Sequence, residues 1–256
     1  MKGRSDVKSQ ETERIAKVIA RAGLCSRRDA ERWIADGRVS VNGRTLESPA
    51  FTVAPDDRIL VDGKPLPKSE VARVFLYHKP AGLVTTSRDE RDRPTVFENL
   101  PAGLPRVISV GRLDLNSEGL LLLTNDGGLA RYLELPATGM KRRYRVRVHG
   151  TVKPADLAAL ARGLTVDGVK YGPIDARMAR MARMEREQSG ANAWLSVTLQ
   201  EGKNREIRKV LAHLGLQVNR LIRTAYGPFE LGDLAPGEVT EVKPEALRAG
   251  LPGYFG

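Results

Sequence analysis

The sequence predicts an α+β protein with two domains: a small N-terminal helix-helix-strand domain and a larger domain with a mainly antiparallel, mixed β-sheet and flanking helices. Three observations favour this class. Two short helical patterns near the N-terminus are followed by alternating strand patterns, strand patterns outnumber helical ones further on, and short Asp-Gly or Pro-Gly turns join several strands. With 256 residues and 41% apolar side chains, the chain can bury a sizeable core.

The composition along the chain predicts where the domains begin and end. Residues 1–12 are polar and are expected to form a mobile arm, and residues 13–66 to form the small domain. Residues 67–72 are a Pro- and charge-rich linker, 73–249 the large domain and 250–256 a C-terminal tail.

The first part of the small domain carries two helix signals. Apolar residues recur at helical spacing from Ile15 to Ala22, and Gly23 provides a stop. Ser26 can cap a second helix with Asp29 at the capping-box position; Trp33 and Ile34 face inward, and Gly37 ends the helix.

The second part of the small domain reads as two short hairpins. The segments "RVSVNGRTL" and "RILVDGKPL" alternate apolar and polar residues around an Asn-Gly and an Asp-Gly pair. These dipeptides favour two-residue hairpin turns, so both segments are predicted as strand pairs.

The large domain reads mostly as strands. The segment "VFLYHKPAGLVTT" predicts a strand, a turn built on Pro80 and Gly82, and a second strand. Helices are expected at 153–162, begun by Pro154 and ended by Gly163, and at 205–214, capped by Asn204 and ended by Gly215. Further strands are expected at Val107 to Val110, Leu120 to Leu123, Tyr144 to Val148 and Leu195 to Leu199.

The net charge of +11 points to a polyanionic partner, with nucleic acid favoured. Charge alone does not separate RNA from DNA or from an acidic membrane surface. Cys25 is the single cysteine and there are three scattered histidines, so a disulfide within the chain, a cysteine-based zinc site and a metal cluster are not expected. The longest leucine run, Leu120 to Leu123, is far short of a membrane span, and a single cysteine fits a reducing cytoplasm, so we expect a soluble, cytoplasmic protein.

The stretch "SVGRLDLNSEGLLLLTNDGG" places Arg112 and Asp114 between apolar runs. A strand can continue through "LDL" only if Asp114 leaves the apolar face or meets a cation, because an unpaired buried carboxylate is costly. Arg112 is the neighbour in sequence, but a cation from elsewhere in the chain could serve.

Two further segments carry candidate site residues. If "KRRYRVRVHG" is a strand, Tyr144 points to the core face while Arg143, Arg145 and Arg147 share the other face, which is solvated or faces RNA. On the predicted helix 205–214, Arg205 and Arg208 flank a buried stripe that includes Ile207, and they could contact phosphate, approach an acid or remain on the surface.

These segments carry a close resemblance to a known family. "GRLDLNSEGLLLLTNDG", with "HKPAGLVTT" before it and "EGKNREIRKVL" and "VNRLIRTAYGP" after it, resembles the RsuA family of RNA pseudouridine synthases. Residues 13–66, with "RIAKVIARAGLCSRRDAERWI" and "GRVSVNG", resemble the RNA-binding domain of a small-subunit ribosomal protein and of tyrosyl-tRNA synthetases. Together they are most similar to the RluB type, which modifies large-subunit ribosomal RNA.

The resemblance implies a cofactor-free isomerase that converts a uridine of ribosomal RNA to pseudouridine. Asp114 would be the catalytic residue, acting either at the anomeric ribose carbon or through a glycal route begun by proton abstraction. Tyr144 would pack against the target base, Arg208 would pair with the aspartate and Ile207 would line the pocket. Arg112 would help to hold the nucleotide in a flipped-out conformation, because a stacked nucleotide hides its glycosidic bond.

The resemblance also implies how the small domain meets RNA, and it leaves some alternatives open. Basic side chains of this domain match RNA-contacting positions: Arg14, Lys17, Arg27, Arg28 and Arg38. A small-subunit RNA target and a non-catalytic ribosome assembly factor are the alternative functions. A metal-dependent nuclease would need clustered carboxylates or histidines, which the sequence lacks. We expect a monomer.

Overall fold

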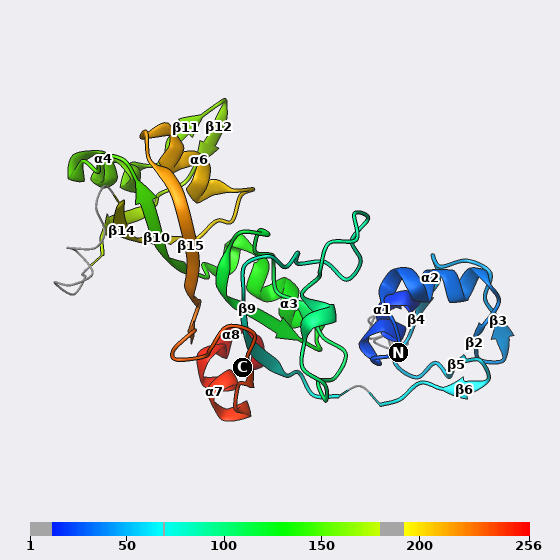
Figure 1. The fold of residues 1–256 in the computed structure, drawn as a ribbon. Helices are drawn as coiled ribbons and strands as arrows, with labels where there is room; N and C mark the ends of the chain where they lie inside the picture. The colour runs from blue at the N-terminus through cyan, green and yellow to red at the C-terminus, as the bar shows by residue number, and fades with distance from the viewer. Residues whose placement is uncertain (1–11, 69, 180–191) are drawn as a thin grey trace, which may run out of the picture. The chain divides into compact units, whose positions relative to one another are not determined.

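The computed structural model describes residues 12–68, 70–179 and 192–256 of the chain. The chain divides into two compact units, Met1–Ala72 and Arg73–Gly256, and each is described by itself (Figure 1). The expected N-terminal arm lies outside the described residues, apart from Thr12. In the described part of the chain, no helix has the length and apolar character that crossing a membrane requires.

The two helices of the small unit form as the sequence predicts. Helix α1 spans Ile15–Arg21 and buries Ile15 and Ile19, while α2 spans Arg27–Ala35 and buries Ile34. The predicted capping box begins α2: the Ser26 hydroxyl accepts a hydrogen bond from the Asp29 backbone N–H at 3.1 Å, and the Asp29 carboxylate accepts from the Ser26 N–H at 3.2 Å. Local signals therefore fix both helices.

The strands of the small unit confirm both predicted hairpins. Asn42 and Gly43 in one turn, and Asp62 and Gly63 in the other, have positive φ angles of 50° and 83°, and 50° and 73°, as this two-residue turn requires. The two hairpins join in a sheet with the order β3-β2-β5-β6, and a separate pair, β1-β4, runs beside α1. The strands are β1 (Glu13–Arg14), β2 (Val39–Val41), β3 (Arg44–Thr45), β4 (Thr52–Val53), β5 (Ile59–Val61) and β6 (Lys64–Pro65).

The large unit is built on a mixed sheet whose path is β13-β14-β10-β15-β9-β7-β17, with β8 beside β9 and β16 beside β15. The pairings are antiparallel except for β9 with β15, which run parallel, so the predicted α+β class with a mainly antiparallel sheet is confirmed. A small hairpin, β11 (Leu164–Val166) with β12 (Val169–Tyr171), lies apart from this sheet. The sheet strands are β7 (Val74–Lys79), β8 (Ile108–Ser109), β9 (Glu118–Thr124), β10 (Arg142–His149), β13 (Asp175–Met178), β14 (Asn192–Leu199), β15 (Gln217–Tyr226), β16 (Phe229–Glu230) and β17 (Val239–Glu241).

Helices flank this sheet, and two of them follow the sequence prediction closely. The expected helix 153–162 is α4 (Pro154–Ala159) continued by the 3-10 turn η3 (Leu160–Arg162), and Gly163 ends it with a φ of 72°. The expected helix 205–214 is α6 (Glu206–His213). Five further helical elements among the described residues were not predicted: α3 (Gly127–Glu134), α7 (Pro244–Gly250), α8 (Pro252–Phe255), η1 (Phe97–Asn99) and η2 (Pro136–Thr138).

Two local expectations were wrong. The strand expected after Gly82 is reduced to one bridge between Val84 and Thr95. Asn204 does not cap α6: Arg205 occupies that position, in a left-handed conformation and without a side-chain capping bond. The "LDL" residues 113–115, for which the sequence set only a condition, lie in a loop between β8 and β9.

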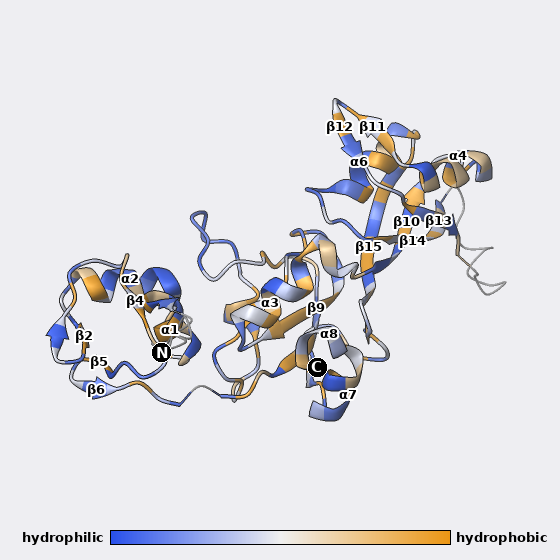
Figure 2. Ribbon diagram, turned by 180° about the vertical axis from the view of Figure 1, so that it is seen from behind, coloured by the Kyte–Doolittle hydropathy of each residue, from blue (hydrophilic) through white to orange (hydrophobic). Residues whose placement is uncertain are grey.

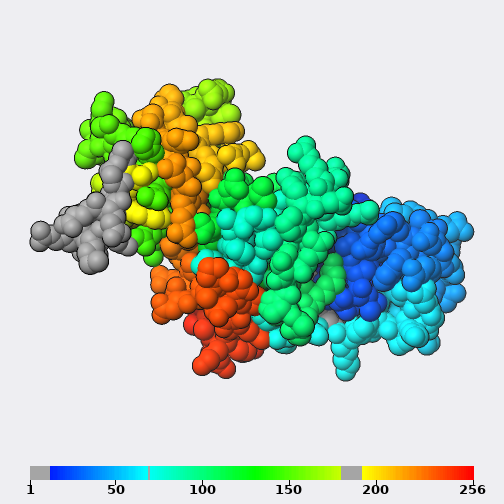
Figure 3. Space-filling model, in the orientation of Figure 1, coloured from blue at the N-terminus to red at the C-terminus, as the bar shows by residue number. Residues whose placement is uncertain are grey.

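The C-terminal residues pack on the large unit. Residues 252–255, expected to form a tail, form α8, and the Tyr254 ring lies 5.3 Å from that of Tyr132 on α3. This segment is red in Figure 3, where it lies against the green and orange parts of the same unit.

The core of the large unit contains the central strands of its sheet. Leu120 to Leu123 on β9 are fully buried, because β9 is a central strand, and Figure 2 colours it largely as hydrophobic. On β10, Tyr144, Val146 and Val148 are buried and alternate with more exposed arginines, as the sequence predicts. This buried face joins one core cluster with α4 and α6.

Candidate active site

The loop at residues 111–117 carries Asp114 and is held by hydrogen bonds from several sides. The Gly111 N–H donates to the Glu134 carboxylate at 2.7 Å, and the Thr85 hydroxyl donates to the Leu113 carbonyl oxygen at 2.9 Å. The Gly82 N–H donates to the Leu115 carbonyl oxygen at 2.8 Å. A loop fixed at this many points can present one side chain in a defined place.

Lys79, at the end of β7, lies beneath this loop and is fully buried. Its ammonium group donates hydrogen bonds to the carbonyl oxygens of Ser117 at 2.8 Å and Leu115 at 3.5 Å, and also to that of Pro80 at 2.9 Å. Burial lowers the pKa of Lys79 to about 8, against the attraction of Asp114 and Glu118.

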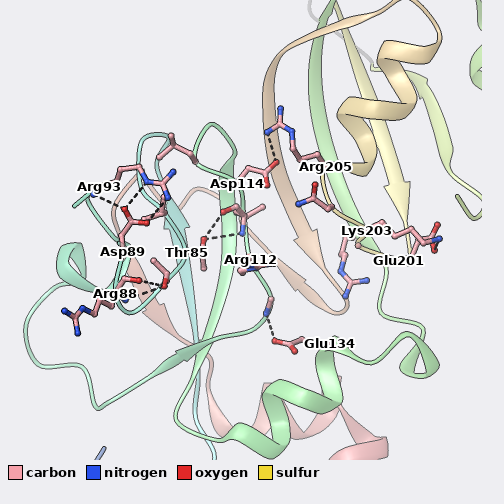
Figure 4. Close-up of a pocket in the computed structure, with 18 of the residues that line it drawn as sticks. Thr85, Arg88, Asp89, Arg93, Arg112, Asp114, Glu134, Glu201, Lys203 and Arg205 are labelled. Carbon is pink, nitrogen blue, oxygen red and sulfur yellow. Dashed lines mark hydrogen bonds and ion pairs between the residues drawn. The ribbon is translucent and has the colours of Figure 1, made fainter. Parts of the chain in front are cut away.

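The carboxylate of Asp114 is one-third exposed and its ion pair is with Arg205, at 3.5 Å between Oδ2 and Nη1 (Figure 4). Spacing alone leaves the source of a cation for Asp114 open, and the family resemblance implies Arg208. In this structure, Arg205, three residues earlier, makes the ion pair, because its left-handed backbone precedes α6 and its half-exposed side chain reaches the loop.

Arg208 instead ties the same loop to the sheet. Its Nη2 donates to the carbonyl oxygen of Asn116 at 2.9 Å and its Nη1 to that of Val218 at 3.1 Å. Burial lowers the pKa of Arg208, repulsion from Arg205 adds to this, and attraction to Asp114 opposes it. Arg208 therefore lies close enough to Asp114 to affect it electrostatically, but its two hydrogen bonds are donated to backbone carbonyl oxygens.

The five residues predicted for the site meet at one cavity of about 140 Å³: Asp114, Tyr144, Arg208, Arg112 and Ile207. They come from the 111–117 loop, β10 and α6, which are far apart in the sequence. Tyr144 and Ile207 are buried in its wall, whereas Arg112 is exposed at the surface. A carboxylate, a phenol and a guanidinium in one concave site are groups that can attack, pack against and orient a polar ring.

A wider cavity of about 1020 Å³ adjoins the first and shares Asp114, Arg112 and Arg205 with it. Figure 4 shows its other side formed by the segment that carries Arg88, Asp89 and Arg93. In that segment, Asp89 accepts two hydrogen bonds from the Arg93 guanidinium, at 3.0 and 2.7 Å. Asp114 thus lines both the smaller cavity and the wider one.

Sequence reasoning missed several residues of the pocket. Arg142 is buried and donates to the Tyr226 hydroxyl at 2.7 Å, which donates in turn to the Leu133 carbonyl oxygen at 2.9 Å. The alternation of buried and exposed residues on the strand that carries Tyr144 could have indicated Arg142, because Arg142 is two residues away and on the same face.

Glu206 also lines the pocket, and its Oε1 atom is buried without a partner. Burial raises the pKa of Glu206 to about 7, and repulsion from Glu201 contributes in the same direction. An acidic residue at a helix start is common for reasons of the helix dipole, so no pattern in the sequence distinguishes Glu206 from an ordinary surface glutamate.

The five basic residues predicted for RNA contact in the small unit are not alike in the structure. Arg14, Arg27 and Arg28 are exposed. Lys17 pairs with Glu13, and Arg38 forms two hydrogen bonds with Asp62, at 2.9 and 2.6 Å, while lying 4.7 Å from the centre of the Trp33 ring.

Comparisons with known proteins identify the family to which this two-unit chain belongs. Residues 73–213 match the family described as RNA pseudouridylate synthase, and residues 13–59 match the S4 domain. The chain belongs to the RNA pseudouridine synthases of the RsuA/RluB type, with an N-terminal S4 domain that binds RNA.

Named relatives and a solved structure support this placement. An uncharacterized RNA pseudouridine synthase of Rickettsia bellii is 51% identical over 90% of this chain and 96% of its own length. Ribosomal large subunit pseudouridine synthase B of Shigella flexneri is 42% identical over 86% of this chain and 76% of its own length. The crystal structure of a pseudouridylate synthase is 26% identical, with a TM-score of 0.63 over 93% of this chain and 99% of that one.

Proposed function

We propose that this enzyme converts a uridine of large-subunit ribosomal RNA to pseudouridine, with Asp114 as the reacting residue. The observation that carries the proposal is that Asp114, Tyr144 and Arg208 converge on one pocket from three separate segments. The relatives named ribosomal large subunit pseudouridine synthase B, at 42% identity, support the choice of RNA.

The reaction breaks the bond between N1 of uracil and C1′ of ribose and forms one between C5 and C1′, while C5 loses a proton and N1 gains one. The carboxylate of Asp114 either attacks C1′ or removes a proton from the ribose to begin a glycal route. Contacts with the pocket walls would keep the released uracil close to the ribose, so that the base can turn and rejoin through carbon.

The other pocket residues bind and orient the nucleotide. Tyr144, buried on β10, offers its ring to the base, and Ile207 provides an apolar wall. Arg208 acts as a positioning residue, because it holds the Asn116 carbonyl two residues after Asp114. Arg112 lies exposed and would hold the backbone of an extruded nucleotide.

The small unit adds affinity for structured RNA. Arg14, Arg27 and Arg28 are exposed and can contact phosphates directly, whereas Lys17 and Arg38 would first have to leave carboxylate partners. A ribosomal substrate also favours a cytoplasmic location. The monomeric state stays a prediction from the sequence.

The test is to map pseudouridines in ribosomal RNA from a strain that lacks this gene, by carbodiimide treatment and primer extension. We expect one stop in the large-subunit RNA to disappear and to return when the wild-type gene is supplied. Loss of a stop in the small-subunit RNA would move the target to that RNA. An unchanged map in both RNAs would contradict the proposal and favour a non-catalytic assembly factor.

A further inference from the structure

Arg205 has a geometry that its neighbours at the site do not share. Its backbone is left-handed, with φ 52° and ψ 33°, a conformation that is uncommon for a residue with a side chain and is often found at functional sites. Its side chain is half exposed, and it borders both the smaller pocket and the wider cavity.

The pair that Arg205 forms with Asp114 is loose compared with other ion pairs of the same unit. It is one contact of 3.5 Å, whereas Arg220 and Glu118 form two hydrogen bonds of 2.8 Å each. A single, partly exposed ion pair contributes about 1 kcal/mol or less, so it can be broken at little cost.

Most other cations around the pocket are committed to partners in the protein. Arg208 donates to two backbone carbonyls and Arg142 to the Tyr226 hydroxyl, while Lys203 donates to the Lys170 carbonyl at 2.6 Å and pairs with Glu201. Arg205 is held more weakly than any of these three.

A uridine in RNA brings a phosphodiester on each side of its ribose. These anions must come close to the carboxylate of Asp114, and like charges repel unless a cation lies between them. A guanidinium matches a phosphate with two hydrogen bonds, which is a better geometry than the single contact with Asp114.

We propose that Arg205 is a positioning residue that exchanges partners: it pairs with Asp114 in the free protein and with a phosphodiester next to the target uridine in the complex. The exchange uncovers the carboxylate as the nucleotide is seated. This inference rests on the proposed function of the pocket and adds to it, besides Arg112, a second residue that contacts the nucleotide backbone.

The test combines a change in the protein with a change in the RNA. The substrate is the ribosomal RNA stem-loop found by the mapping experiment, made with an uncharged methylphosphonate either before or after the target uridine. Kd, KM and kcat are measured for the wild-type protein and for Arg205→Gln. A charge-assisted hydrogen bond corresponds to a loss of about tenfold or more when one partner is removed.

We expect Arg205→Gln to weaken binding of the unmodified RNA about tenfold, with kcat within a few fold. One methylphosphonate should weaken binding to the wild-type protein by a similar factor and should weaken binding to Arg205→Gln by no more than about twofold, because the two changes remove the same contact. Arg73→Gln is the matched control: its guanidinium hydrogen bonds to Glu241 on β17, and this variant should keep the full methylphosphonate effect.

Additive losses at both phosphate positions would overturn the exchange, as would a fall in kcat with unchanged Kd, which would mean that Arg205 acts on Asp114 alone. A failure of the proposed function can be told apart from these outcomes, because the wild-type protein would then bind the unmodified stem-loop but form no pseudouridine.

Discussion

Lys79 and Ser117 are joined by a hydrogen bond of 2.8 Å from the lysine ammonium group to the serine carbonyl oxygen, in a fully buried position. Burying an ammonium group is costly, and here its donors are used on the loop that carries Asp114. The end of β7 thus fixes the loop that presents the carboxylate. The cost of this arrangement should appear in the pH dependence of stability.

The Lys79→Met variant tests that cost. The pKa of Lys79 is about 8 in the folded protein and 10.5 when unperturbed, so the unfolded state binds more protons between these values. The contribution of Lys79 to the free energy of unfolding therefore rises with pH across this window, by up to about 3 kcal/mol. Urea unfolding at a series of pH values should show that, as pH rises, the free energy of unfolding of the wild type increases relative to that of the variant. A difference that does not change from about pH 8 to 10.5 would contradict this account.

Glu206→Gln should show the opposite dependence. Burial raises the pKa of Glu206 from 4.5 to about 7, so the folded state binds more protons and the stabilising contribution of the protonated group is lost as pH rises through that range. A glutamine mimics the protonated carboxyl. It can still accept the hydrogen bond that the Lys203 backbone N–H donates to Glu206 at 2.9 Å. The variant should match wild type near pH 4.5 and exceed it above pH 7 by up to about 3 kcal/mol in chemical unfolding. Equal stability of the two proteins at both ends of the range would refute the raised pKa.

Gly119→Ala should disrupt the parallel pairing of β9 with β15. A Cβ at this position would lie 2.3 Å from the Arg223 carbonyl oxygen, and Gly119 also has a φ of 99°. We expect a loss of about 3 kcal/mol or more in the free energy of unfolding, because backbone has to move.

Gly168→Ala, in the turn between β11 and β12, is the matched control for Gly119→Ala. It has a φ of 76° but nothing within 4 Å of the added Cβ, so only the backbone conformation is penalised, by about 1 kcal/mol. Thermal or urea unfolding of both variants checks the comparison. Equal losses would mean that the close approach of the two strands is not what Gly119 permits.

Local signals accounted for much of the fold. The capping box at Ser26 and Asp29 and the Asn-Gly and Asp-Gly turns each act within a few residues, so the sequence displays them directly. The alternation on β10 likewise put Tyr144 on the buried face. Helix α3 was missed although Asp126 caps it, because Gly127 and Gly128 fill its first turn and glycine pairs are typical of turns instead of helices.

The site was predictable as a set of residues, but its contacts were not. The resemblance to a known family gathered Asp114, Tyr144 and Arg208 before any geometry was known, and they do line one pocket. Which arginine reaches Asp114 depends on the left-handed turn at Arg205, a tertiary feature with no periodic signal. The buried position of Lys79 likewise depends on the packing of the 111–117 loop over the end of β7.

The most direct test of the central claim is the conversion of uridine by purified wild-type protein and by Asp114→Asn, on the same ribosomal RNA. Asparagine keeps the size of the side chain and removes the charge that attacks or takes a proton. We predict that product formation falls by at least about three orders of magnitude, with RNA affinity within a few fold and unchanged thermal stability. Substantial turnover in a clean Asp114→Asn preparation would contradict the account.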